Sequence, residues 1–286
     1  MQMNNAVQLL EQIGLEAIEE NIYRGKSHSI GGRRVFGGQV LAQALEAATL
    51  TVSEDRYAHS MHGYFILPGD VNNPIIYNVD RIRDGGSFTT RRVVAIQHGR
   101  AYFNMSASFQ IKEDGFEHQI DMPNVPPPEA LRNGSMLMKE YEDRLPDYLK
   151  KNLALPRPIE FRPVEMPYFV NPSKGRPFRH VWLRVKGKMS DRAADHRTLL
   201  AYASDYNLLE TSLRPHGTTW TEVIAASLDH AIWFHRDFRI DDWLLYALDS
   251  PSASNARGFT RGNLFDRNGK LVASVVQEGL IRERRK

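Results

Sequence analysis

The chain has 286 residues, a length that allows one large domain or two modest ones. Its net charge of +3 is too small to indicate the basic patch of a nucleic-acid-binding protein, so no nucleic-acid partner is expected. The absence of cysteine excludes disulfides, thiolate metal sites and a cysteine nucleophile. No stretch has the ~18 apolar residues of a membrane span, and the N-terminus does not resemble a secretion signal. We therefore expect a complete, soluble, cytoplasmic protein with no membrane partner.

The first predicted elements form a strand, a helix and then several strands. A strand is expected near residues 22–24, and residues 40–48 combine high helix propensity with apolar residues at helical spacing. Runs rich in β-forming residues follow, with a hairpin turn at 84–86, where glycine can supply the positive φ of a tight hairpin. An apolar strand over 101–111 completes the series.

The composition then changes over residues 116–160, which we assign to a connecting segment. Residues 122–128 are rich in proline, which predicts a stiff, extended linker. A charged amphipathic helix is expected over 129–152, and the prolines within 155–158 close the connection.

The remaining residues, 161–286, repeat the earlier order of elements. A strand is predicted at 180–185 and a helix at 199–213, again followed by β-rich runs. A hairpin turn at 268–269 leads into an apolar strand over 271–281.

The two series of elements are related as an internal repeat. Residues 59–65 parallel 227–234, and residues 87–92 parallel 257–261, at a nearly constant offset of about 168 positions. Chance matches would not keep both order and spacing, so residues 1–115 are predicted to form a first unit equivalent to the second. Two such units side by side can extend one antiparallel sheet around their helices, which is the α+β pattern of a double hotdog fold.

Several short motifs also resemble those of one family. They lie at residues 36–40, 65–70, 202–205, 228–235 and 275–279. Through them the chain resembles the type II acyl-CoA thioesterases, double-hotdog enzymes of bacteria and peroxisomes, over nearly its whole length. The resemblance implies hydrolysis of medium- to long-chain fatty acyl-CoA as substrate, no cofactor apart from the CoA of that substrate, and a homo-oligomer, either dimer or tetramer.

In this family a carboxylate, a hydroxyl and a glutamine hold the attacking water, and by motif position these fall on Asp205, Ser227 and Gln277. Some members have threonine at the hydroxyl position, and serine keeps the same donor and acceptor. Each residue also has an ordinary structural interpretation. Asp205 could cap a helix, Ser227 could be a small core residue, and Gln277 could end a strand in water.

The requirements of thioester hydrolysis explain why residues of these types would form the site. Thioester hydrolysis needs an aimed, partly deprotonated water and a donor for the developing oxyanion. Asp205 can accept the proton, and the backbone N–H groups of Gly37 and Gly38 at a helix start are candidate oxyanion donors. The first copy lacks the three polar residues. We therefore expect one active site per chain, in the second unit, with the first supplying the glycine amides and part of an acyl tunnel.

Histidines and arginines offer further candidates. Among the histidines, His59 is a second-rank catalytic candidate, and His59 and His62 are expected on opposite faces of a strand. No zinc-protease or α/β-hydrolase signature occurs, and no metal is expected. The arginines that could meet the CoA phosphates, or simply cover a solvated sheet face, are Arg91, Arg92, Arg257 and Arg261.

Two other functions compete with thioester hydrolysis. Hotdog hydratases of enoyl-CoA use an Asp-x-Asn-Pro-x-His pattern, which residues 205–207 begin, but the proline and histidine are missing. A non-catalytic acyl-CoA sensor would keep the fold and lose the chemistry, and the presence of Asp205, Ser227 and Gln277 together argues against it.

Overall fold

The computed structural model describes residues 5–30, 34–145, 150, 157–167, 173–218 and 222–284. The elements of the first half are α1 (Ala6–Ile13), β1 (Leu15–Glu19), β2 (Ile22–Gly25), α2 (Gly37–Thr49), β3 (Tyr57–Phe65), β4 (Ile75–Asp84), β5 (Phe88–Gln97) and β6 (Arg100–Gln110). Those of the second half are α3 (Gly134–Glu140), β7 (Ile159–Pro163), β8 (Phe178–Val185), α5 (Ala193–Ser204), α6 (Leu208–Leu213), β9 (Val223–Ser227), β10 (Asp229–Phe234), β11 (Leu244–Ser254), β12 (Arg257–Phe265) and β13 (Leu271–Glu283).

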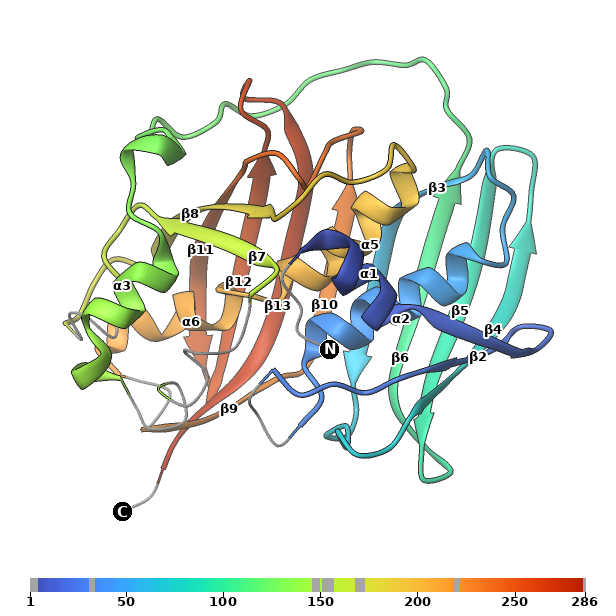
Figure 1. The fold of residues 1–286 in the computed structure, drawn as a ribbon, viewed down its shortest axis with the longest axis horizontal. Coiled ribbons are helices and arrows are strands. Elements are labelled where there is room, and N and C mark those ends of the chain that lie inside the picture. Colours follow the sequence, from blue (N-terminus) through green and yellow to red (C-terminus); the bar gives the residue numbers. More distant parts are fainter. Residues whose placement is uncertain are drawn as a thin grey trace.

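The strands form one continuous antiparallel sheet whose order mirrors itself about its centre. It runs β1-β2-β4-β5-β6-β3 on one side and β10-β13-β12-β11-β8-β7 on the other, and β9 pairs separately with β13. The seam is the pairing of β3 with β10, at the middle of Figure 1. The order of strands confirms the internal repeat and the double hotdog fold, while the exact domain boundaries stay a prediction.

Ion pairs on the sheet surface repeat with the strands. Arg92 pairs with Asp80 across β5 and β4, and Arg261 pairs with Asp249 across β12 and β11. The two pairs occupy corresponding strands of the two units, so the duplication extends to individual side chains.

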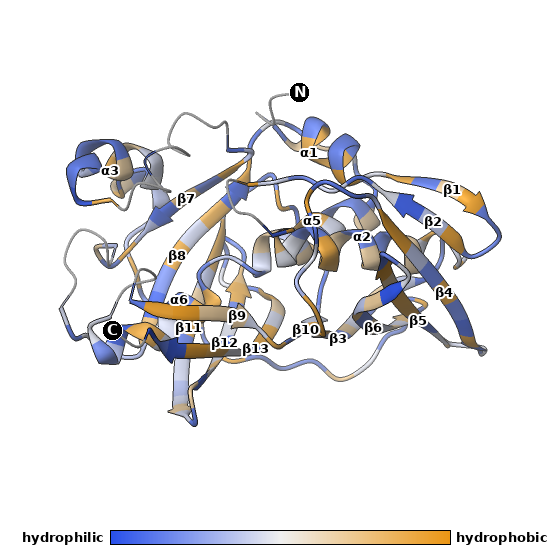
Figure 2. Cartoon of the chain, turned by 90° about the horizontal axis from the view of Figure 1, so that it is seen from below, coloured by the Kyte–Doolittle hydropathy of each residue, from blue (hydrophilic) through white to orange (hydrophobic). Residues whose placement is uncertain are grey.

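The helices lie on one face of the sheet and carry the main core. Figure 2 shows α2 and α5 side by side beneath α1, with the sheet curving around them. One apolar cluster runs through both units, from Leu41 and Leu45 of α2 to Leu199 and Leu200 of α5. Burial of this continuous surface, rather than two separate cores, holds the units together. Among the described residues no helix is long and apolar enough to cross a membrane.

The predicted helix over 199–213 is wrong as a single element. The structure breaks it into α5 and α6, and the residues between them leave the helical conformation. Asn207 has a φ of 70°, in the left-handed region that asparagine tolerates better than most residues. The helix over 40–48, by contrast, is confirmed as α2.

The connecting segment also differs from the expectation. The helix predicted over 129–152 is reduced to α3 with a short 3-10 turn on either side, and most of its last part lies outside the described residues. Asn133 caps α3 through its side chain, and Tyr141 turns the chain away from helical geometry. The proline-rich stretch is extended, but it is held against the second unit, because Trp182 Nε1 donates to the Pro126 carbonyl over 2.9 Å.

Both predicted hairpin turns are present. Gly269 has a φ of 83°, as the expectation requires. Gly85 and Gly86 do not have positive φ, so the conformational reason given for that turn does not hold. In the first hairpin the Gly85 N–H bonds instead to the Phe88 carbonyl over 2.9 Å.

Candidate active site at the seam

Three predicted polar residues meet beside the seam, and we call Asp205, Ser227 and Gln277 the polar trio. Asp205 takes the C-cap position of α5, Ser227 ends β9, and Gln277 lies within β13. The side chain of Gln277 is buried, whereas Asp205 and Ser227 stay partly exposed. The carboxylate and the hydroxyl thus belong to residues that are partly open to solvent, whereas the amide that contacts both is buried.

Gln277 joins the other two members of the trio through one amide nitrogen. Its Nε2 donates to Asp205 Oδ1 over 3.0 Å and to Ser227 Oγ over 2.6 Å. Both amide hydrogens are then used, and among the described residues the Ser227 hydroxyl hydrogen has no acceptor, so it can be donated. The Gln277 Oε1 atom is buried and has no hydrogen-bond partner within the described part of the chain.

The carboxylate of Asp205 also reaches into the first unit. Phe36 occupies the N-cap position of α2 and offers no capping side chain. Asp205 Oδ2 accepts the Gly38 N–H over 2.9 Å and so supplies the missing cap from the other unit. This contact corrects the expected role of Gly38, because its N–H holds Asp205 instead of standing open for an oxyanion. Gly37 contributes the preceding N–H, which has no partner inside the helix.

Asp205 combines two opposing electrostatic effects. Loss of water around the carboxyl group raises the pKa of Asp205 from 3.8 to about 6, while the hydrogen bonds from Gln277 and Gly38 lower it. The carboxyl group is therefore ionised at neutral pH but remains a far better proton acceptor than an ordinary aspartate.

Comparison with known proteins identifies the family. Family models match in both units: acyl-CoA thioesterase over residues 156–280, and acyl-CoA thioesterase N-terminal domain over residues 24–110. The chain is 41% identical to Acyl-CoA thioesterase 2 of Haemophilus influenzae, over 98% of each chain. The chain belongs to the acyl-CoA thioesterase family.

Other relatives and solved structures agree with this assignment. Acyl-coenzyme A thioesterase 8 of Mus musculus is 41% identical over 94% of this chain and 87% of its own length. The crystal structure of acyl-CoA thioesterase II TesB2 from Mycobacterium marinum matches with a TM-score of 0.79 and 39% identity, over 96% and 98% of the two chains. A hotdog-fold protein from Alicyclobacillus acidocaldarius, at 16% identity and a TM-score of 0.77, over 96% of this chain and 98% of its own, shows the fold alone.

An aromatic cluster packs around Tyr206, the residue after Asp205, in this family member. The ring of Phe36 lies 5.2 Å from that of Tyr202 and 4.6 Å from that of Tyr206. Phe161 adds a further ring 5.2 Å from Tyr206. These residues come from both units and form an apolar wall beside Asp205. Composition gave no reason to select them, although Phe36 and Tyr202 belong to motifs that carried the resemblance.

His59 lies away from the polar trio, on the opposite face of the sheet. The register of β3 against β6 shifts between Ala58 and Ser60, which turns the His59 ring toward Ser108, with 2.8 Å between Nε2 and Oγ. Ser108 pairs with Ser60 and shares the face that also carries His62. The expectation that His59 and His62 lie on opposite faces is therefore wrong, and His59 does not join the site of this thioesterase family member.

The arginines considered for the CoA phosphates are already paired with carboxylates. Arg91 is buried against Asp84, and Arg257 pairs with Glu278. The two remaining arginines form the repeated surface pairs described above. A phosphate would have to compete with these carboxylates, so none of the four is a free anion site.

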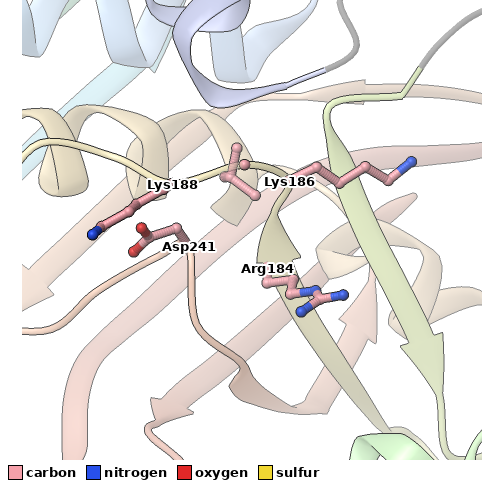
Figure 3. A pocket seen from close by; sticks show the side chains of 6 residues that line it. Arg184, Lys186, Lys188 and Asp241 are labelled. Atoms are coloured by element: carbon pink, nitrogen blue, oxygen red, sulfur yellow. The ribbon is translucent and has the colours of Figure 1, made fainter.

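A shallow hollow elsewhere is equally unsuited to be the site. It lies between the end of β8 and the start of α5, and Figure 3 shows Lys186 and Lys188 pointing in opposite directions. Arg184 is engaged by Glu160 across 2.9 Å. Asp205 lies at the other end of α5, about 18 Å away by helical rise. Among the described residues, no group of three or more His, Cys, Asp or Glu side chains could hold a metal ion.

Proposed function

We propose that this protein hydrolyses acyl-CoA thioesters to a free carboxylic acid and CoA, with the polar trio as its catalytic residues. The observation that carries the proposal is the convergence at one point of the desolvated carboxylate of a partly exposed aspartate, a hydroxyl group and a supporting amide. Relatives named acyl-CoA thioesterases over nearly the whole chain support the same substrate class.

The attacking group is a water molecule. It donates one hydrogen to the Asp205 carboxylate and accepts a hydrogen bond from Ser227, which leaves a lone pair directed at the thioester carbon. As the C–O bond forms, Asp205 takes the proton, and the carbonyl oxygen becomes an oxyanion that the Gly37 N–H can stabilise. Collapse of this intermediate breaks the C–S bond, and the proton on Asp205 passes to the departing thiolate.

The apolar wall gives the acyl chain its place. The rings of Phe36 and Phe161 pack against Tyr206, the residue after Asp205, and offer an apolar surface to the acyl chain. A medium- to long-chain fatty acyl group would bury its methylenes there at about 0.8 kcal/mol each. Thiol release measured across a series of acyl-CoA chain lengths tests this specificity, and maximal turnover of acetyl-CoA would contradict it.

The same experiments separate hydrolysis from the two competing functions. A thioesterase releases free thiol and the acid in equal amounts. With crotonyl-CoA as substrate, hydration would consume the double bond without releasing thiol, and a sensor would bind without any turnover. Thiol release that persists in Asp205→Asn at the wild-type rate would remove the polar trio from the mechanism.

Turnover should depend on the ionisation of Asp205. Because the base of the free enzyme is ionised only above its pKa of about 6, kcat/KM should fall about tenfold for each pH unit below that value and level off above it. The loss of thioester absorbance in the ultraviolet follows the reaction at acid pH, where thiol dyes react slowly. A profile that stays flat down to about pH 4.5 would contradict the role of Asp205 as base.

Gly37→Ala should reduce turnover without unfolding the protein. A Cβ at Gly37 would lie 2.7 Å from Asp205 Oδ2, so the carboxylate must move and kcat should fall about 10- to 100-fold. Gly38→Ala is the contrasting variant, because its Cβ would lie 2.3 Å from the backbone oxygen of Tyr202, which cannot move aside. We expect Gly38→Ala to lose stability in thermal unfolding. Wild-type kcat in Gly37→Ala would contradict the placement of Asp205.

We also propose a homo-oligomer in a reducing, cytoplasmic environment. The support for the environment is compositional, because a chain with no cysteine needs no oxidising compartment. Light scattering on the purified protein measures the mass directly, and a monomer at micromolar concentration would contradict self-association.

A further inference from the structure

Ser204, the residue before Asp205, is fully buried and held at three points. Its hydroxyl donates to the Ala201 carbonyl over 2.9 Å, and its own carbonyl accepts the Tyr246 hydroxyl over 3.0 Å. Its Oγ also lies 2.9 Å from Nε2 of His230. The last residue of α5 is thus fixed through its side chain and its backbone.

These contacts define the state of His230. The single hydroxyl hydrogen of Ser204 is directed to Ala201, so Oγ must accept a hydrogen from Nε2 of His230. Nε2 therefore carries a hydrogen. Burial lowers the pKa of His230 to about 3, so the ring is neutral at every pH of interest and this is its only N–H hydrogen. Nδ1 is left buried with no hydrogen-bond partner among the described residues.

The Ser204–His230 pair is not a nucleophile and its base. Ser204 is 0% exposed and its hydroxyl hydrogen is directed away from His230. A buried imidazole that resists protonation is a weak base, and no substrate carbon can approach Oγ. The pair must act on something other than the thioester itself.

The position of the Ser204–His230 pair in the fold indicates that it acts on the end of α5, next to Asp205. Asp205 sits between the end of α5 and the left-handed Asn207, where the backbone leaves the helix. The last carbonyls of a helix have no intrahelical donors, and a helix end without other contacts frays. Here His230 and Tyr246 supply the contacts, from β10 and β11.

We propose that His230 and Tyr246 are positioning residues of the thioesterase reaction, which fix Ser204 and thereby aim the Asp205 carboxylate at Gly38 and Gln277. The inference rests on the proposed function of Asp205. This role accounts for a buried histidine whose Nδ1 has no partner among the described residues. Only the hydrogen on Nε2 is needed, because it is the one that holds Ser204.

The test compares three variants in thioester hydrolysis. His230→Leu removes the donor and should lower kcat about 10- to 100-fold with KM within about twofold. His230→Gln can place an amide donor near the position of Nε2 and should recover most of kcat. Tyr246→Phe removes one hydroxyl and should lower kcat about 10-fold.

The pH profile separates positioning from general instability. If Asp205 loses its alignment with Gly38 and Gln277, it loses two hydrogen bonds that lower its pKa, so the acid limb of kcat/KM moves to higher pH. The matched control is His196→Leu. Like His230, His196 is buried, but it belongs to α5 itself, near the end away from Asp205, and both of its ring nitrogens are bonded. This control should lose thermal stability and leave the acid limb in place.

A double variant tests whether the parts act as one unit. Ser204→Ala and His230→Leu interrupt the same hydrogen bond, so the double variant should be no slower than His230→Leu alone. Losses that multiply, or wild-type kcat and an unmoved acid limb in folded His230→Leu, would overturn the proposal. If His230→Leu does not fold, Ser204→Ala and Tyr246→Phe decide by the same criteria. Asp205→Asn measured in parallel reports separately on the proposed function.

Discussion

Asp205→Asn should lower kcat for acyl-CoA hydrolysis by about 1000-fold and make the protein more stable at neutral pH. Asparagine keeps the shape of the side chain but cannot accept the proton of the attacking water, and loss of a general base typically costs 10²- to 10⁴-fold. KM should change little, because the acyl chain is proposed to bind to the aromatic wall rather than to the carboxylate. Thiol release gives both constants, and kcat within tenfold of wild type would contradict the assignment.

The expected gain in stability follows from the pKa of Asp205. The folded protein holds this pKa at about 6, against 3.8 for an unperturbed aspartate. Below both values the group is neutral in the folded and unfolded states and imposes no penalty. Between them the unfolded chain ionises first, so the free energy of unfolding falls as pH rises. Above about pH 6 the full penalty applies, which is about 3 kcal/mol for two pKa units.

Thermal unfolding at two pH values tests this sign. Asp205→Asn should unfold at a higher temperature than wild type at about pH 7.5, and the difference should vanish near pH 4. The net gain should be smaller than 3 kcal/mol, at about 1–2 kcal/mol, because an asparagine amide meets the Gln277 donor less well than a carboxylate does. A variant that is less stable than wild type at neutral pH would show that the ionised Asp205 carboxylate does not lower the free energy of unfolding.

Gln277→Leu should lower kcat by about 100- to 1000-fold with little loss of stability. The substitution removes the amide that connects Asp205 with Ser227, so neither group is held toward the water. It also removes a hydrogen bond that lowers the pKa of Asp205, so the acid limb of kcat/KM should move to higher pH. The free energy of unfolding should change little, because removal of the Oε1 atom, which has no partner in the described structure, offsets the greater cost of holding Asp205 ionised without this hydrogen bond.

Gln97→Leu is the matched control for this variant. Gln97 is also buried on a strand, in β5 of the first unit, and both ends of its amide are bonded. Its loss should lower the unfolding temperature and leave kcat and the acid limb unchanged, which is the reverse of Gln277→Leu. If both variants lose stability and keep kcat, Gln277 has only a structural role.

The repeat and the identity of the polar trio could be read from the sequence because both rest on order along the chain. The offset of about 168 positions predicted two equivalent units, and the mirrored order of strands confirms them. Motif position brought Asp205, Ser227 and Gln277 to attention, and the structure places them in contact. Helix propensity was sufficient for α2, where apolar residues and a uniform composition agree.

The errors concern conformations that single residues decide. Propensity carried the second helix through residues 205–207, because it does not weigh a left-handed Asn207 against the apolar residues on either side. Likewise, alternation along β3 placed His59 and His62 on opposite faces, because it cannot detect an irregular register at Ala58–Ser60. The Asp205–Gly38 contact joins residues 167 positions apart, so no local pattern could reveal that the amide is occupied.

The cap that Asp205 places on α2 has a consequence for how the two halves of the chain could evolve. The carboxylate belongs to one half, and the helix start that it completes belongs to the other. A hotdog protein built from two identical subunits must keep both sets of residues in a single sequence, whereas here each half carries one. After the duplication, selection could therefore preserve the polar trio in the second half and the glycine-containing start of α2 in the first. The covalent connection keeps the two halves together in equal number, and neither half alone holds both partners of the Asp205–Gly38 contact.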